Sequence, residues 1–145
     1  MTDQESMRSA IIHRMKEEEW YYITNHLSQY NAEESEGFSR KPGIPINLTL
    51  KDDQQVIGGL MGRTIYLSFI IDHLWIDKTY RGKGHGTRLV REGERLAKEE
   101  GCISSQTSTY SFQAPEFYKK LDYDIFGVFA GYPDGIKKFY LGKDL

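Results

Sequence analysis

The residues best suited to chemistry lie in a glycine-rich turn that reads Tyr-Arg-Gly-Lys-Gly-His-Gly-Thr over residues 80–87. Three glycines within five residues let the backbone approach a ligand closely and turn its N–H groups toward it. A helix predicted over residues 84–100 adds unpaired N–H groups and a partial positive charge at its first turn. The side chains of Arg81, Lys83 and Arg88 add Coulombic attraction. The turn therefore predicts a phosphate-binding site.

Two common phosphate-binding motifs do not fit this turn. A P-loop requires Gly-Lys-Ser/Thr with a further glycine five residues upstream, but Gly84 follows Lys83 and residue 77 is an aspartate. The dinucleotide fingerprint requires a glycine at the sixth position, which Thr87 or Leu89 occupies here. A nucleotide-phosphate binder of another kind stays open as an interpretation.

The turn lies between the strand and the helix that the sequence predicts most clearly, since residues 68–77 are rich in β-branched and aromatic side chains. A strand–helix–strand step there requires parallel pairing, whereas the flanking hairpins require antiparallel pairing. The sequence thus predicts a mixed α/β sheet with helices on its faces. Strands are expected over 9–15, 47–51, 55–67, 68–77, 102–109, 124–132 and 138–141, and helices over 16–34, 84–100 and 115–120.

Composition and charge limit the classes of protein that fit. The chain has 145 residues, of which 39% are hydrophobic and 28% charged, as in one ordinary globular domain. With 19 basic and 21 acidic side chains, the net charge of −2 gives no general case for nucleic-acid binding. One cysteine, Cys102, excludes a disulfide within the chain and a multi-cysteine zinc site. No apolar run reaches the roughly 18 residues that span a bilayer, and no signal peptide is evident, so a cytoplasmic protein is expected.

A second motif gives the chain a family resemblance. Arg81, Gly84 and Gly86 fit the pattern Arg-x-x-Gly-x-Gly, and residues 114–123 read Ala-Pro-Glu-Phe-Tyr-Lys-Lys-Leu-Asp-Tyr. In this order and at this spacing, the two segments resemble the GNAT superfamily of acyl-CoA-dependent N-acyltransferases. The resemblance implies a mixed, largely antiparallel, splayed sheet of about six to seven strands with helices on both faces.

The resemblance also implies how the chain is organised and what it binds. Residues 1–145 would form one N-acetyltransferase domain, with a variable acceptor-side region at 1–45 and an acetyl-CoA-binding core at 69–132. The diphosphate of acetyl-CoA, the cosubstrate, would lie on the backbone of the glycine-rich turn, and its pantetheine arm would lie beside the preceding strand. The implied cofactor-binding residues are Leu74, Trp75, Ile76, Arg81, Gly82, Lys83, Gly84, His85, Gly86, Thr87, Ser111 and Phe117.

The reaction that the resemblance implies is a direct attack of a neutral amine on the thioester in a ternary complex. Tyr118 aligns with the family tyrosine that protonates the departing thiolate, and a phenol carries its proton at neutral pH. A backbone N–H near Ile76 would hold the carbonyl oxygen as charge develops. Asp72 and His73, which strand alternation places on opposite faces, are two candidates for the general base, and solvent is a third.

The sequence leaves the acceptor and some alternatives open. Residues 1–53 hold 6 basic and 10 acidic side chains, which favours a cationic small molecule or peptide amine as acceptor. A polyamine, an aminoglycoside-like antibiotic, an amino acid and a protein N-terminus all fit. Ser111 stands where many members have Asn, so a catalytically idle CoA-binding module is the alternative to an enzyme. Asp122 stands where many members have Gly, a departure expected to affect the turn after the short helix and not the chemistry. No metal, nucleic acid or membrane is expected as a partner, and a homodimer is left open.

Overall fold

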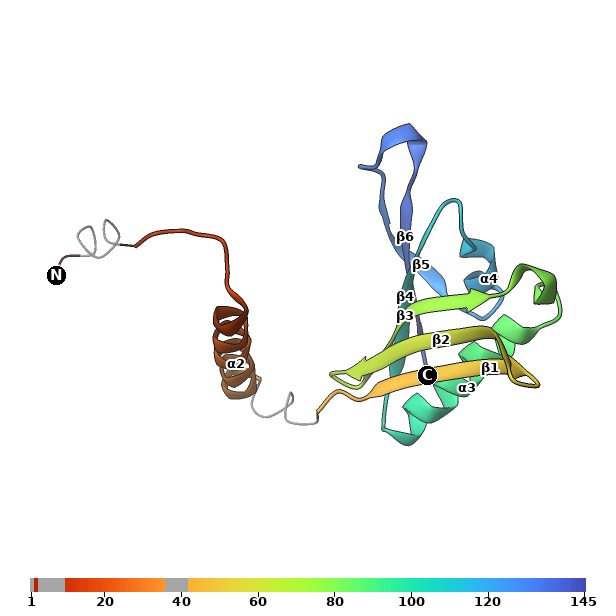
Figure 1. Cartoon of the computed structure of the whole chain (residues 1–145), viewed down its shortest axis with the longest axis horizontal. Coiled ribbons are helices and arrows are strands. Elements are labelled where there is room, and N and C mark those ends of the chain that lie inside the picture. Colours follow the sequence, from red (N-terminus) through yellow and green to blue (C-terminus); the bar gives the residue numbers. More distant parts are fainter. Residues whose placement is uncertain (1, 3–9, 36–41) are drawn as a thin grey trace. The chain divides into compact units, whose positions relative to one another are not determined.

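The structure is a computed structural model that describes residue 2 and residues 10–35 and 42–145 (Figure 1). These residues belong to two compact units, Met1–Arg40 and Lys41–Leu145. The first unit contains helix α2 (Glu17–Glu34), and the second contains all the strands described below. No helix among the described residues is long and apolar enough to cross a membrane.

Helix α2 confirms the helix predicted near the start of the chain. Three glutamates occupy its first turn, where the helix dipole favours negative charge. The side chain of Glu19 accepts a hydrogen bond of 2.8 Å from the backbone N–H of Lys16. The strand predicted over 9–15 was wrong for residues 10–15, which have no regular structure and no described strand beside them to pair with. Ser9 lies outside the described residues.

The second unit is built on one six-stranded sheet in the order β1-β2-β3-β4-β6-β5. Only β3 and β4 pair in parallel, because helix α3 connects them as a crossover, and all other neighbours are antiparallel. The predicted mixed α/β fold with a largely antiparallel sheet is confirmed. The elements are β1 (Pro45–Asp52), β2 (Gln55–Ile65), β3 (Ser68–Ile76), α3 (His85–Glu99), β4 (Ser104–Tyr110), α4 (Pro115–Lys119), β5 (Asp124–Phe129) and β6 (Lys138–Asp144), with short 3-10 helices η2 (Lys78–Tyr80) and η3 (Pro133–Gly135).

The sheet splays open halfway along β3, as expected. Residues 68–71 of β3 pair with residues 104–107 of β4, and beyond them β3 pairs only with β2 and β4 only with β6. The separation begins at a β-bulge: Met61 pairs with His73 and Gly62 pairs with Ile71, which leaves Asp72 as the extra residue. The bulge therefore lies at the point where the two halves of the sheet diverge.

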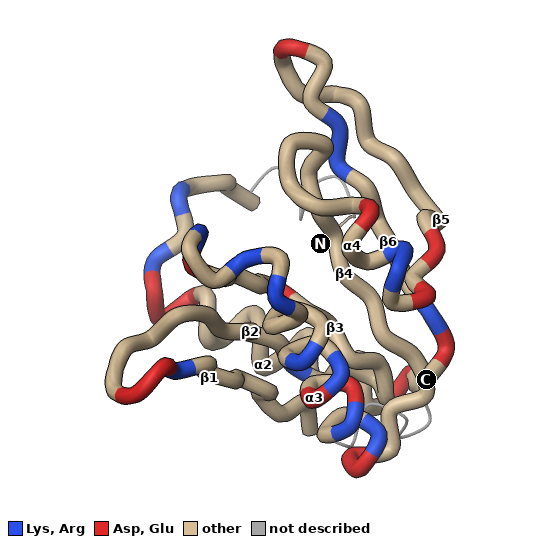
Figure 2. The backbone as a smooth tube through the Cα atoms, turned by 90° about the vertical axis from the view of Figure 1, so that its right-hand side faces the viewer, with Lys and Arg blue, Asp and Glu red and all other residues tan. Residues whose placement is uncertain are grey.

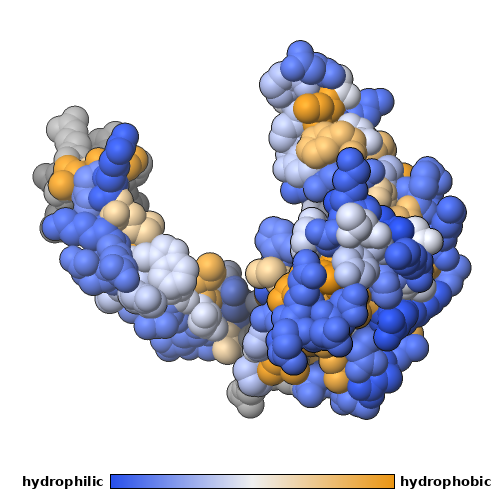
Figure 3. Space-filling view, turned by 45° about the vertical axis from the view of Figure 1, so that its right-hand side comes forward, coloured by the Kyte–Doolittle hydropathy of each residue, from blue (hydrophilic) through white to orange (hydrophobic). Residues whose placement is uncertain are grey.

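The β5–β6 hairpin extends away from the rest of this unit (Figure 1). Apolar side chains are exposed near its end among hydrophilic ones (Figure 3). Val128 and Phe129 of β5 have 54% and 52% of their surfaces exposed. The exposed end of the hairpin therefore contributes little to the core, whereas Leu141 of β6 is fully buried in it.

The core of the second unit depends on how closely α3 approaches the sheet. Phe69 and Leu60 are fully buried on the sheet, and Val90 on α3 is fully buried too. A Cβ atom on Gly93 would lie 2.9 Å from Cζ of Phe69, and one on Gly62 would lie 2.7 Å from Cε2 of the same ring. The two glycines therefore make room for the Phe69 ring.

Replacing Gly93 by alanine is expected to destabilise the protein by about 1–3 kcal/mol, because the added methyl group must displace the Phe69 ring in a filled core. Urea denaturation measures this free energy of unfolding. Gly127→Ala is the matched control, since its Cβ would lie 3.8 Å from Tyr140 at an ordinary contact distance. Equal stabilities for the two variants would show that Gly93 is not required for this packing.

Candidate active site

The glycine-rich turn leads from the end of β3 into α3. Asp77 accepts hydrogen bonds from the hydroxyl of Thr79 at 2.6 Å and from its backbone N–H at 2.9 Å, and these bonds lower the pKa of Asp77. Gly82 and Gly84 have φ angles of 73° and 83°, in the left-handed region that favours glycine. Gly84 is the N-cap of α3, and no side chain caps this first turn. Basic residues gather around the turn and along α3 (Figure 2).

The turn is held by the protein on one side and open on the other. The Nε of Arg81 donates a hydrogen bond of 2.9 Å to the carbonyl oxygen of Ile76, which ties the turn to β3. A Cβ atom on Gly86 would lie 3.2 Å from the Phe117 ring, so the start of α3 packs closely on α4. A Cβ on Gly82 or Gly84 would meet no atom of the described residues within 4 Å. The backbone amides of the turn therefore border open space at the positive end of a helix.

A cavity of about 730 Å³ runs from this turn along β3 to the point where β3 and β4 separate. It is lined by the predicted catalytic residues and by all the predicted cofactor-binding residues except Lys83 and Ser111. The ammonium of Lys83 lies 5.5 Å from the centroid of the Tyr80 ring. The hydroxyl of Ser111 accepts a hydrogen bond of 3.1 Å from the backbone N–H of Lys137. Lining residues that the sequence analysis missed are Tyr80, Thr107, Ser108, Thr109, Phe112, Gln113 and Ala114.

The edge of β3 beside this cavity presents backbone groups to it. The N–H of Asp77 donates to the carbonyl oxygen of Ile57 on β2 at 2.8 Å. Because successive residues of a strand direct their backbone groups to opposite edges, Leu74 and Ile76 direct theirs away from β2. Arg81 already occupies the Ile76 carbonyl. The N–H groups of Leu74 and Ile76 and the carbonyl of Leu74 therefore offer hydrogen bonds to an extended ligand.

Tyr118 of α4 lies at the inner end of the cavity, with 6% of its surface exposed. Burial raises the pKa of the Tyr118 phenol, and a hydrogen bond with the Thr107 side chain offsets part of this shift. The Thr107 hydroxyl donates its one proton to the carbonyl oxygen of Ile71 at 3.1 Å, at the last residue of β3 that pairs with β4. The phenol therefore holds its proton at neutral pH, next to the opening of the sheet.

Asp72 and His73 are both exposed and both line the cavity. The bulge at Asp72 interrupts the alternation that placed these two side chains on opposite faces, so that expectation was wrong at this position. Oδ2 of Asp72 accepts a hydrogen bond of 3.0 Å from Nε of Arg63, a partner that the sequence analysis did not identify. Of the two candidate bases, Asp72 is thus held in an ion pair.

A second cavity of about 470 Å³ shares Asp72, His73, Thr107 and Ser108 with the first. These shared residues surround the point where the sheet opens, so the two cavities meet there. The remaining lining residues are Asn47, Met61, Gly62, Ile70, Ile71, Gln106, Lys138 and Tyr140. Within the described residues, no group of three or more His, Cys, Asp or Glu side chains is placed to hold a metal ion.

The family model described as acetyltransferase (GNAT) family matches residues 10–123, which is more than half of the chain. The chain belongs to the GNAT acetyltransferase family. The predicted family is therefore confirmed, and the protein is an acyltransferase of this family.

Individual relatives agree with this assignment. This GNAT acetyltransferase is 41% identical to the blasticidin-S acetyltransferase of Streptomyces morookaense over 92 residues, which cover 63% of this chain and 68% of the relative. The crystal structure of an acetyltransferase from Bacillus cereus is 34% identical, with a TM-score of 0.87 over 94% of this chain and 98% of that chain. A Bacillus anthracis acetyltransferase solved with acetyl coenzyme A shares the fold, with 22% identity and a TM-score of 0.63 over 70% of this chain and 62% of that chain.

Proposed function

We propose that this GNAT acetyltransferase transfers the acetyl group of acetyl-CoA to a primary amine of a small molecule or peptide. The observation that carries the proposal is the cavity that runs from the uncapped start of α3, along the edge of β3, to the buried Tyr118 phenol. The relative solved with acetyl coenzyme A supports the choice of cosubstrate.

The residues present fit acetyl-CoA, which supplies the acetyl thioester. The amides of residues 82–87 suit its diphosphate, because the N-terminus of a helix stabilises a phosphate group and the two left-handed glycines leave space for it. The N–H of Ile76 and the carbonyl of Leu74 suit its amide-containing arm, which can pair with β3 as an added strand does. Lys83 and Ser111 have no place in this lining, so their predicted contacts with the cofactor remain predictions without support from the cavity.

The chain's own residues supply the proton transfers of the proposed reaction. A nitrogen–carbon bond forms, the thioester carbon–sulfur bond breaks, the amine loses one proton and the departing sulfur gains one. Tyr118 donates the proton to the sulfur, because its buried phenol is protonated at neutral pH. The N–H of Leu74, which faces the cavity closer to the opening of the sheet than the predicted N–H near Ile76, stabilises the negative charge that develops on the carbonyl oxygen. We assign the base to His73, acting directly or through water, because Arg63 already holds Asp72.

The amine acceptor is proposed to occupy the second cavity, since an attacking nitrogen must reach the thioester where the two cavities meet. Blasticidin S is the first acceptor to test, because the relative from Streptomyces morookaense is named for it. Release of free thiol from acetyl-CoA over a panel of amines measures turnover, with Tyr118→Phe and Gly84→Glu as controls. Full activity in both variants would contradict the proposal.

Two other outcomes would favour the alternative functions. Binding of CoA without turnover on any amine would favour the idle CoA-binding module, and tighter binding of ATP than of CoA would favour a nucleotide binder. The cytoplasmic location and the homodimer remain predictions.

Lys138 is expected to select acceptors by charge. Its ammonium lies 5.4 Å from the centroid of the Tyr140 ring in the wall of the second cavity. Among the described residues that line this cavity, Lys138 is the only lysine or arginine. Lys138→Met should raise KM about tenfold for amines that carry a carboxylate or phosphate, since a charge-assisted hydrogen bond is lost. KM for acetyl-CoA should not change. Lys137→Met is the matched control, because Lys137 lines neither cavity. Equal effects of both changes would show that Lys138 does not face the acceptor.

A further inference from the structure

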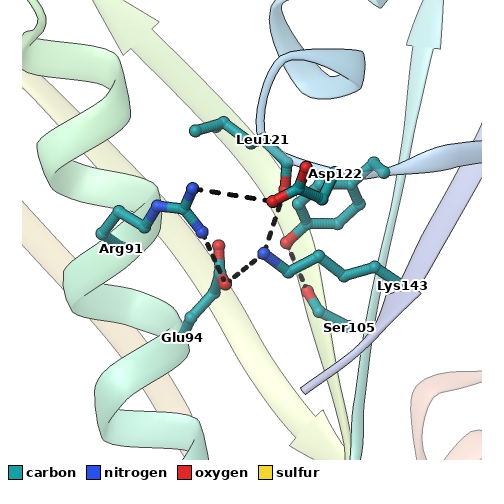
Figure 4. A network of polar contacts seen from close by, with 7 residues as sticks. Arg91, Glu94, Ser105, Leu121, Asp122 and Lys143 are labelled. Atoms are coloured by element: carbon teal, nitrogen blue, oxygen red, sulfur yellow. Dashed lines mark hydrogen bonds and ion pairs between the residues drawn. The ribbon is translucent and has the colours of Figure 1, made fainter.

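A buried ion pair joins α3 to β6 next to the turn that follows α4 (Figure 4). Nζ of Lys143 lies 2.6 Å from Oε2 of Glu94, and the two side chains are 10% and 7% exposed. The other carboxylate oxygen of Glu94 is buried without a hydrogen-bond partner among the described residues. Removing two charges from water is costly, so an apolar pair of similar size often stabilises a core as much as a buried ion pair does. Stability alone therefore does not account for this pair, and the contacts that it makes with the neighbouring turn indicate a second role.

Lys143 holds the turn between α4 and β5 directly. Its ammonium donates a hydrogen bond of 3.0 Å to the carbonyl oxygen of Leu121, the second residue after α4. The same ammonium lies 5.1 Å from the centroid of the Tyr123 ring. Two of the three residues 121–123 of this turn thus contact a charge that Glu94 fixes in place.

The middle residue of the turn is held from α3. Asp122 has a φ angle of 70°, in the left-handed region that the glycine of many family members would adopt more easily. Its carboxylate lies 4.0 Å from Nη2 of Arg91, and Nη1 of Arg91 lies 3.7 Å from Glu94. Arg91 therefore connects the buried ion pair to Asp122, so residues 121–123 are held from both α3 and β6.

This turn fixes the position of Tyr118. The backbone N–H groups of Leu121 and Tyr123 both donate to the carbonyl oxygen of Tyr118, at 3.0 and 3.1 Å. The rings of Tyr118 and Tyr123 meet edge to face, with centroids 5.6 Å apart. The hydroxyl of Tyr123 is in turn hydrogen-bonded to the hydroxyl of Ser105 on β4 at 2.7 Å. The backbone and the ring of Tyr118 are thus both held by the turn.

We infer that Glu94 and Lys143 are positioning residues for Tyr118: their ion pair fixes the 121–123 turn and thereby the phenol that protonates the departing sulfur. This inference rests on the proposed role of Tyr118 as the acid. Neither Glu94 nor Lys143 lines either cavity, so both act only through the turn. Positioning of this kind affects catalysis strongly, because a misplacement of about 1 Å can cost about a hundredfold in rate.

The test replaces both charges together, with Glu94→Met and Lys143→Met in one protein, so that no unpaired charge stays buried. We expect kcat to fall about tenfold, while KM for acetyl-CoA stays within about twofold because the cofactor contacts are untouched. Arg95→Met is the control, since Arg95 pairs with Glu92 and Glu99 on the exposed side of the same helix, and its kcat should equal that of the unchanged protein. Assays run well below the melting temperature of each variant.

The same change in a Tyr118→Phe background separates positioning from general damage. If the ion pair acts through the Tyr118 hydroxyl, the double methionine change has no further effect on kcat once that hydroxyl is gone. An equal loss in both backgrounds, or no loss with Tyr118 present, would overturn the inference and leave the acid role of Tyr118 intact. Full kcat in Tyr118→Phe alone would overturn the acid role, and the inference with it.

Arg91→Met provides a second variant that should fold normally, because the Arg91 side chain is half exposed. It should lower kcat about threefold, and only when Tyr118 is present.

Discussion

Replacing Tyr118 by phenylalanine is expected to lower kcat by about 10²- to 10⁴-fold, which is the usual contribution of a positioned general acid. The ring should stay in place, because it packs against Phe117 and Tyr123 at centroid distances of 5.0 and 5.6 Å. The variant therefore loses one hydroxyl and keeps its fold. KM for acetyl-CoA should change little, since the loss affects the transition state rather than cofactor binding.

The pH dependence of the reaction rate tests the same acid role of Tyr118. Burial raises the pKa of Tyr118 above the ordinary value of about 10, so the proton-donating form persists through neutral and mildly alkaline solution. The rate should therefore not fall through titration of this acid until the pH exceeds about 10. A rate that increases toward pH 10 only when Tyr118 is present would mean that the phenolate is the active form, which contradicts the acid role.

A matched variant controls for the loss of a tyrosine hydroxyl. The hydroxyl of Tyr132 is hydrogen-bonded with Tyr110, and Tyr132 lines neither cavity. Tyr132→Phe should therefore keep kcat within about twofold, because nothing that touches the reacting atoms has changed. Similar losses in the two variants would indicate that tyrosine hydroxyls affect the fold rather than the chemistry.

Gly84→Glu is expected to weaken the binding of acetyl-CoA by a hundredfold or more. The new side chain would occupy the open space beside the start of α3 and would place a carboxylate where we expect the diphosphate. The negative charges of the carboxylate and the diphosphate repel each other. The left-handed φ of 83° at this position also adds strain for any residue with a Cβ. Calorimetry with CoA measures the change in Kd directly.

Gly135→Glu separates strain from ligand repulsion. Gly135 has a φ of 74° and, like Gly84, would place a Cβ in open space, but it lies in η3 between β5 and β6, outside both cavities. The two variants should lose similar stability, while only Gly84→Glu should lose affinity for CoA. Unchanged affinity in Gly84→Glu would show that the diphosphate does not bind at this turn.

The local parts of the fold could be predicted because their signals lie within short segments. The strand at 68–76, the helix that follows the glycine-rich turn and the short helix that begins at Pro115 all have their own periodicity or terminating residues. The glycine-rich turn was recognised as a candidate phosphate-binding site for the same reason, since its glycines and basic residues are adjacent in the sequence.

The features that the sequence analysis missed depend on distant partners. The bulge at Asp72 arises from the register between β2 and β3, which no pattern within β3 reveals. Ser111 is engaged by Lys137 on the approach to β6, 26 residues away. The ion pair of Glu94 with Lys143 joins a helix to the last strand, and only the fold brings the two together.

The structure of the protein with CoA bound tests the proposed cradle most directly. The diphosphate oxygens should lie about 2.7–3.2 Å from backbone nitrogens between Gly82 and Thr87, with the pantetheine arm beside Leu74 and Ile76. A diphosphate bound elsewhere, with those amides facing away from it, would contradict the assignment of the cavity to acetyl-CoA.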